Sequence, residues 1–350
     1  MESTEGENIN ELPLGIYPLP DDVLLYIFSM LPFKDLLNIR ESCRKFYRLI
    51  DSNRYRVSIK NSSRLVIESN KKWGRSTFSV RVDILKPDNI KGISLRMFTK
   101  IDIENGDELS NCFDLFDMKT LFSLNIIDCD NVGIFKALKD TFRQVGQLNT
   151  VYIDRVGVDD LNDLQSFIQN LGSIKHLEIR HICSGKPQDK KNNKLFSSLE
   201  LPSTKTLERL ILTECESTEI LDNKLMIELI KNNKNLKVLE VSSTNDTFVK
   251  QLIDDFIKTQ EVTKKSNNCD HNEVTLFLKC AYGNKETPAS ITQSITLFVH
   301  GKNLSKLQLG DLGKHICIFN FCGKCKQLHG WINIMFGSED KYHQNGLTYY

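Results

Sequence analysis

Residues 19–50 read LPDDVLLYIFSMLPFKDLLNIRESCRKFYRLI, a stretch that is dense in large apolar side chains at helical spacing. Pro20 followed by Asp21 and Asp22 is typical of a helix start, because proline suits the first turn and acidic side chains favour the positive end of the helix dipole. We expect three short helices in this stretch. A unit this small exposes more apolar surface than it can bury within itself. The stretch therefore predicts a helical unit that packs against a partner.

The composition of the whole chain excludes several classes of protein. The 350 residues include 46 Lys and Arg against 45 Asp and Glu, so no bulk charge directs the chain to nucleic acid or to a membrane. No apolar run approaches the roughly 20 residues that span a bilayer. The N-terminus lacks the basic and apolar regions of a secretory signal, and the ten cysteines then predict reduced thiols. We expect a cytoplasmic or nuclear protein.

Charge is polarised at the front of the chain. Residues 1–22 carry six acids and no base, and residues 1–14 are predicted to form a disordered acidic tail. Residues 40–60 carry seven bases against Glu41 and Asp51. Bases of this kind can neutralise phosphates, which would indicate a nucleic-acid site. We favour the alternative of a solvated helix face or a contact with an acidic partner, and expect no nucleic acid.

Beyond residue 60 an apolar-x-x-apolar-x-apolar pattern recurs, mostly every 26–33 residues, and amphipathic helices are predicted between the copies. The copies are Ile90/Ile93/Leu95, Leu121/Leu124/Ile126, Leu148/Val151/Ile153, Ile174/Leu177/Ile179, Leu207/Leu210/Leu212, Leu236/Leu239/Val241 and Leu304/Leu307/Leu309, with a degenerate copy expected around Val274–Leu278. Four of the expected helices carry Ile134/Leu138/Phe142, Leu161/Leu164/Phe167, Leu221/Leu225/Leu229 and Phe248/Leu252/Phe256. The polar residues 180–206 are expected to form a long loop.

These copies resemble leucine-rich repeats of the L-x-x-L-x-L-x-x-N/C kind. Cys129 and Cys215 fill the ninth position in two of them, whereas the other copies carry different residues there. The resemblance implies an α/β solenoid over residues 58–350, with short parallel strands alternating with helices. The alternative is an irregular α/β domain with coincidental spacing.

The front stretch resembles an F-box, since the order Leu19-Pro20, Val23-Leu24, Ile27-Phe28 and the apolar positions after them follow that family's signature. The resemblance implies a three-helix F-box over residues 15–57 that docks on a Skp-type adaptor and thereby joins a cullin–RING (SCF-type) ubiquitin ligase. The alternative is an internal helical cap on the repeats. Some signature residues will be internal core and some interface. The residues expected to bind the adaptor are Leu19, Pro20, Val23, Leu24, Ile27, Phe28, Leu31, Leu36, Ile39, Cys43 and Phe46.

The remainder of the chain would recruit a protein substrate, which the sequence does not name. In a repeat domain the outward strand residues line a concave binding face. Tyr152, His176, Glu178, Arg209 and Glu240 are our candidates for that face. The alternative is a leucine-rich-repeat scaffold or binding protein whose F-box acts outside ubiquitination.

The sequence carries no catalytic motif that we recognise, such as a Gly-rich phosphate loop, a Gly-x-Ser-x-Gly elbow or a His-Glu-x-x-His pair. We therefore expect a non-catalytic subunit without a cofactor. A less favoured possibility is structural zinc near the C-terminus, because thiolates at Cys-x2-Cys spacing can bind zinc. Its ligands would be Cys317, Cys322, Cys325 and His329.

Overall fold

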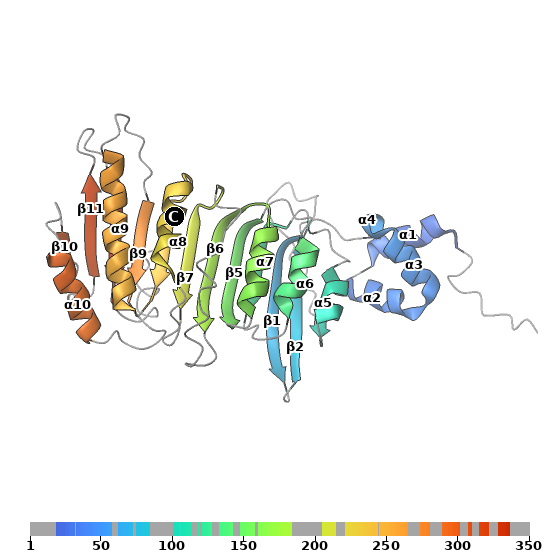
Figure 1. Cartoon of the computed structure of the whole chain (residues 1–350). Coiled ribbons are helices and arrows are strands. Elements are labelled where there is room, and N and C mark those ends of the chain that lie inside the picture. Colours follow the sequence, from blue (N-terminus) through green and yellow to red (C-terminus); the bar gives the residue numbers. More distant parts are fainter. Residues whose placement is uncertain are drawn as a thin grey trace, which may run out of the picture.

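A computed structural model gives the architecture of the chain (Figure 1). It describes residues 19–336 except for 32, 58–61, 73–74, 85–100, 105, 114–117, 119–120, 128–132, 143–147, 158–159, 184–204, 215–220, 244, 265–273, 281–288, 302–306, 310–314 and 322–327. An N-terminal helical unit is followed by a long β-sheet that helices cover on one face. The fold is therefore mixed α/β.

The N-terminal unit consists of α1 (Asp21–Met30), α2 (Phe33–Ser42), α3 (Arg44–Ser52) and α4 (Arg54–Val57). Helix α1 begins after Pro20, as the sequence predicts, with both acids in its first turn. Cys43 caps α3, where its Sγ accepts a hydrogen bond from the Phe46 amide at 3.4 Å. The one-turn helix α4 was not expected. It forms because Val57 is buried in the unit, so the chain must turn once more after α3.

Aromatic and aliphatic side chains from three of these helices form the core of the unit. Phe28 and Phe46 meet edge to face, with ring centroids 5.3 Å apart, and Leu24, Leu36 and Ile50 are fully buried beside them. Each of these residues belongs to the apolar stripe of its own helix. The helical spacing of the apolar residues in the sequence therefore predicts this internal core.

Bases of the stretch 40–60 pair with acids of the same unit. Lys45 Nζ lies 3.5 Å from Asp21 Oδ1, and Arg56 Nη1 lies 2.6 Å from Asp22 Oδ1. Arg40 is buried, with Nη2 3.2 Å from Asp51 Oδ1. These pairs reduce the positive charge that the unit presents to solvent.

Twelve described strands form one sheet. In chain order they are β1 (Ser62–Lys72), β2 (Arg75–Ile84), β3 (Ile101–Ile103), β4 (Ser123–Ile127), β5 (Leu148–Gly157), β6 (Ile174–Cys183), β7 (Arg209–Glu214), β8 (Val238–Ser242), β9 (Val274–Lys279), β10 (Leu307–Leu309), β11 (His315–Phe321) and β12 (Leu328–Met335). Their order across the sheet is β10-β11-β12-β9-β8-β7-β6-β5-β4-β1-β2-β3.

Strands β4 to β9 lie in chain order and are all parallel, which confirms the predicted strands in this middle part. The expected degenerate copy around Val274–Leu278 is β9, a parallel strand between β8 and β12. The expected copy at Ile90/Ile93/Leu95 lies outside the described residues.

The prediction of parallel strands throughout is wrong at both ends of the sheet. Strands β2 and β3 at one end and β10 and β11 at the other pair antiparallel with their neighbours. Leu307 and Leu309 of the last copy thus lie in an antiparallel edge strand, β10, whereas Leu304 lies outside the described residues. The physical reason is the length of the connections, because β1 to β2 and β11 to β12 are joined by far fewer residues than a parallel crossover needs. The sheet is mixed.

Helices α5 (Gly106–Phe113), α6 (Ile134–Thr141), α7 (Leu161–Asn170), α8 (Asn223–Asn232), α9 (Asp246–Lys264) and α10 (Ala289–His300) cover one face of the sheet (Figure 1). The four helices whose residues the sequence analysis names are α6 to α9, whereas α5 and α10 also lie between copies of the repeat but were not named. Phe113, Phe142 and Phe167 form a chain of edge-to-face contacts through α5, α6 and α7. The core lies between this helix layer and the inward strand residues. No described helix is long and apolar enough to cross a membrane.

The expected loop at residues 180–206 begins later than predicted. Strand β6 continues to Cys183 because Ile182 is fully buried and is aligned with Val156 of β5. The polar run that suggested a loop starts only after this strand, in residues outside those described.

Candidate functional site

Helix α1 carries large apolar side chains on its outer face as well as on its inner one. Val23, Tyr26 and Met30 are 41%, 66% and 58% exposed and lie at i, i+3 and i+7, so they share one side of the helix. We call these three residues the α1 stripe. Contiguous exposed apolar side chains of this size are typical of protein interaction sites.

The structure separates the eleven predicted adaptor-binding residues into two groups, a separation that the sequence did not allow. Leu24, Phe28, Leu36 and Phe46 are buried inside the helical unit. The others are exposed or partly covered: Pro20, Val23, Leu19, Ile27, Leu31, Ile39 and Cys43. The surface that an adaptor can reach thus includes the second group, together with three exposed residues that our list of adaptor-binding residues missed, Tyr26, Met30 and Tyr47.

Residues 16–58, which include all four N-terminal helices, match the family model of the F-box domain. The chain contains an F-box domain. Domains of this family generally bind Skp-type adaptors in cullin–RING ubiquitin ligases. The match favours an F-box over an internal cap as the role of this unit. The chain matches none of the curated proteins with which it was compared.

A second surface lies on the sheet, on the side away from the helix layer. Along β5 and β6 buried residues such as Val151 and Leu177 alternate with half-buried ones such as Tyr152 and Glu178. No described helix lies on this side of β5 to β12, which we call the open face. All five residues predicted for substrate binding lie on it: Tyr152, His176, Glu178, Arg209 and Glu240.

The strand register places these five residues side by side. Tyr152 is aligned with Glu178, and His176 is aligned with Arg209. Arg209 Nη2 on β7 lies 3.6 Å from Glu240 Oε2 on the neighbouring strand β8. The structure thus brings the predicted residues together on one surface, while their role in binding stays a prediction.

Tyr152 is the centre of a polar group on β5 and β6. Its hydroxyl donates to Asp154 Oδ1 at 3.1 Å, and the guanidinium of Arg180 lies over its ring, 5.1 Å from the centroid. Arg180 Nε in turn donates to Glu178 Oε1 at 2.7 Å. Burial raises the pKa of Tyr152 to about 12, although the positive charge of Arg180 acts in the opposite direction.

We expect the Tyr152 phenol to remain protonated well beyond its ordinary pKa of 10.0. The folded chain holds this proton more tightly than the unfolded chain does. The raised pKa of Tyr152 therefore adds to the free energy of unfolding below pH 10, and this addition is lost as the pH rises toward about 12. The check is the difference in phenolate absorbance between the native chain and Tyr152→Phe during an alkaline titration. A midpoint near 10.0 for the difference would contradict the burial described here.

Two groups of charged side chains lie farther along the sheet. In the Glu240 trio, Glu240 lies 3.6 Å from Arg209 and 2.5 Å from Lys279. In the Glu208 trio, at the start of β6 to β8, Glu208 lies 3.7 Å from Lys175 and 3.1 Å from Lys237. The hydrogen bond from Lys237 lowers the pKa of Glu208, and burial lowers the pKa of His176 beside it. Near neutral pH, Glu208 is therefore charged and His176 is neutral.

Three aromatic side chains on the open face were missed by the sequence analysis. Trp331 of β12 contacts Phe277 of β9 and Phe319 of β11, with ring centroids 6.1 and 5.9 Å apart. We call these three residues the aromatic platform. The alternation in residues 274–279 could have placed Phe277 outward, but Trp331 and Phe319 lie on two strands that the repeat pattern did not include.

The possible zinc ligands near the C-terminus lie only partly in the described part of the chain. Cys317 is half-buried on β11, and burial raises the pKa of its thiol. His329 lies in β12, whereas Cys322 and Cys325 lie outside the described residues. Among the described residues, no three His, Cys, Asp or Glu side chains are grouped so that they could hold a metal ion.

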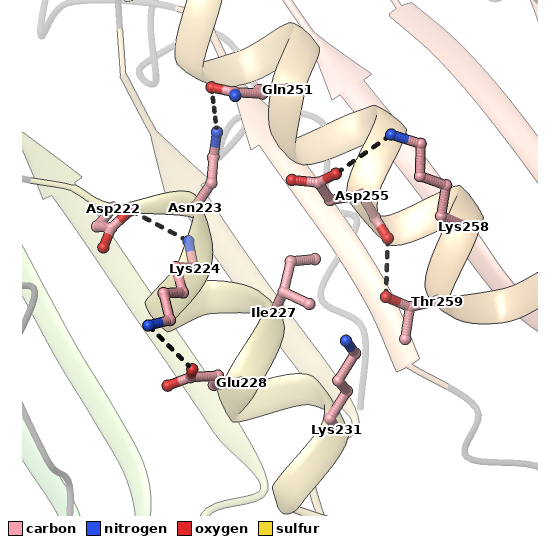
Figure 2. A pocket seen from close by; sticks show the side chains of 10 residues that line it. All are labelled: Asp222, Asn223, Lys224, Ile227, Glu228, Lys231, Gln251, Asp255, Lys258 and Thr259. Atoms are coloured by element: carbon pink, nitrogen blue, oxygen red, sulfur yellow. Dashed lines mark hydrogen bonds and ion pairs between the residues drawn. The ribbon is translucent and has the colours of Figure 1, made fainter. Parts of the chain in front are cut away.

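A groove of about 740 Å³ runs between α8 and α9 in the helix layer (Figure 2). Several of its polar side chains bind one another. Lys224 lies 3.9 Å from Glu228, Lys258 lies 3.6 Å from Asp255, and Asn223 donates to Gln251 at 3.1 Å. This groove therefore offers no grouping of side chains that points to a particular chemistry.

Proposed function

We propose that this chain is the substrate-recognition subunit of an SCF-type ubiquitin ligase. The F-box would dock on a Skp-type adaptor, and the repeat domain, a leucine-rich-repeat-like solenoid, would hold a protein target. The chain would act by proximity and perform no chemistry of its own, in the cytoplasm, the nucleus or both. The observation that carries this proposal is the F-box match over residues 16–58 together with the exposed α1 stripe within it.

The sheet supports the second half of the proposal. Six consecutive parallel strands, β4 to β9, lie in chain order with helices on one side, which is the arrangement that stacked strand–helix units adopt. Their other side presents half-buried polar and aromatic side chains from several strands. Such a surface is suited to recognising another protein.

The test is reconstitution of the full chain with a Skp-type adaptor, a cullin, a RING subunit and a ubiquitin-charged conjugating enzyme. We expect the chain and the adaptor to co-purify, and a protein that binds the chain to be ubiquitinated only when the adaptor is present. A well-folded chain that binds no Skp-type adaptor would refute the proposal. Adaptor binding without any ubiquitinated client would instead favour a scaffold whose F-box acts outside ubiquitination.

A further inference from the structure

The chemistry of the open face indicates what kind of segment it would bind. Its aromatic platform offers an apolar surface rather than free polar groups. The Trp331 indole nitrogen already donates to the Thr275 hydroxyl within the sheet. The three rings are half-buried, so part of each remains accessible. A large apolar side chain from a partner would gain further burial there.

The charged residues beside the platform carry an excess of positive charge. Each of the Glu208 and Glu240 trios contains one carboxylate and two cations, so its formal charge is +1. Glu208 comes directly before Arg209, the first residue of β7. His176 on the open face interacts electrostatically with Arg209 and with all three members of the Glu208 trio, so the two trios lie close together. The nearby His176 adds no charge near neutral pH, and Arg180 is already held by Glu178. An anionic partner is favoured at this place.

The platform and the positive excess lie next to one another. Phe277 and Lys279 are two residues apart on β9 and so point to the same side, and Phe277 is aligned with Glu240 on β8. The row from Glu178 on β6 to Cys317 on β11 crosses five strand spacings, or about 24 Å. An extended peptide of about seven residues covers that distance.

We infer that the open face between β6 and β11 binds an acidic peptide segment of a partner protein. One large apolar side chain of the segment rests on the aromatic platform, and its carboxylates lie beside the Glu208 and Glu240 trios. The inference rests on the proposed function, in which this segment is the recognition element of the ligase's client. A nucleic acid fits less well, because two formal positive charges are few against its closely spaced phosphates.

The probe is a fluorescent pool of acidic peptides about seven residues long, each with one central Leu, Phe, Trp or Met, measured by anisotropy against the full chain. We expect saturable binding that is lost when the central residue is Ser or when Lys replaces the acids. Trp331→Leu should weaken binding about tenfold, and Lys279→Gln about fivefold. The matched controls are Phe122→Ala, an exposed aromatic, and Lys258→Gln, an ion-paired lysine of the helix layer. Both should bind as the native chain does.

Several results would overturn the inference: no binding by any acidic peptide, binding that ignores the central residue, or preferential binding of a single-stranded RNA probe. Circular dichroism of each variant shows whether the sheet is intact, and Trp331→Phe serves if Trp331→Leu is misfolded. Adaptor binding is measured on the same samples. If adaptor binding persists without peptide binding, only this inference fails. If peptide binding persists without adaptor binding, only the ligase proposal fails.

Discussion

Replacement of both Tyr26 and Met30 by Asp is expected to weaken binding of a Skp-type adaptor about 100-fold or more. Both side chains are more than half exposed, so the double variant should keep its fold while it places charges at two of the three positions of the α1 stripe. Central apolar residues of an interface commonly contribute about 2 kcal/mol or more each. Two such losses together correspond to at least this change in dissociation constant. Isothermal titration of the full chain with purified adaptor measures it.

The matched control is Leu297→Asp on α10, whose side chain is 65% exposed, close to the 66% of Tyr26. It adds a charge at an equally exposed apolar position outside the F-box, and the adaptor should bind it with unchanged affinity. Equal weakening by the control and the double variant would show a general loss of folding. Unchanged binding by the double variant would place the adaptor contact elsewhere on the F-box.

Replacement of Phe28 by Ala is expected to unfold the F-box while the sheet remains folded. Phe28 is 1% exposed and meets Phe46 edge to face, and deletion of a buried ring of this kind costs about 3–5 kcal/mol. A helical unit of this size has little stability to lose. Hydrogen exchange followed by mass spectrometry should show rapid exchange over α1 to α4 and unchanged protection over β4 to β9.

Tyr26→Ala is the control for this experiment, since it removes a ring from the outer side of the same helix. It should leave the exchange of the F-box amides unchanged. Protection of α1 to α4 that survives Phe28→Ala would contradict the core described here. Leu24 and Phe28 are poor choices for mapping the interface, because we expect a buried Asp at either position to unfold the unit and so to remove any binding.

The sequence predicts the F-box well because its helices follow from local spacing and end signals. Pro20 and the two acids after it mark the start of α1, and Cys43 caps α3. It does not divide the apolar residues between core and surface, because α1 is apolar on both sides. Tyr26 and Met30 lie at helical spacing from Val23, but that spacing overlaps with the inner stripe of Leu24 and Phe28. Only the packing of α3 and α4 against α1 decides which side is covered.

The middle of the sheet was also predictable, since each copy of the repeat supplies two or more buried strand residues. The ends were not, because an antiparallel hairpin such as β1–β2 has alternation but no repeat period. The aromatic platform depends on the pairing of these end strands, which the repeat pattern does not predict. Phe319 and Trp331 become neighbours only through the pairing of β11 with β12, and Trp331 reaches Phe277 only because β12 pairs with β9.

The position of β12 has a consequence for how the protein is made. It leaves the ribosome after β9, β10 and β11, yet it lies between β9 and β11 in the finished sheet. Until residues 328–335 have emerged, the edge of β9 has no strand to pair with, and the β10–β11 hairpin cannot join the rest. An unpaired strand edge of this kind is open to association with other chains. Completion of this half of the sheet, and with it the surface around Trp331, therefore waits until β12 has been synthesised.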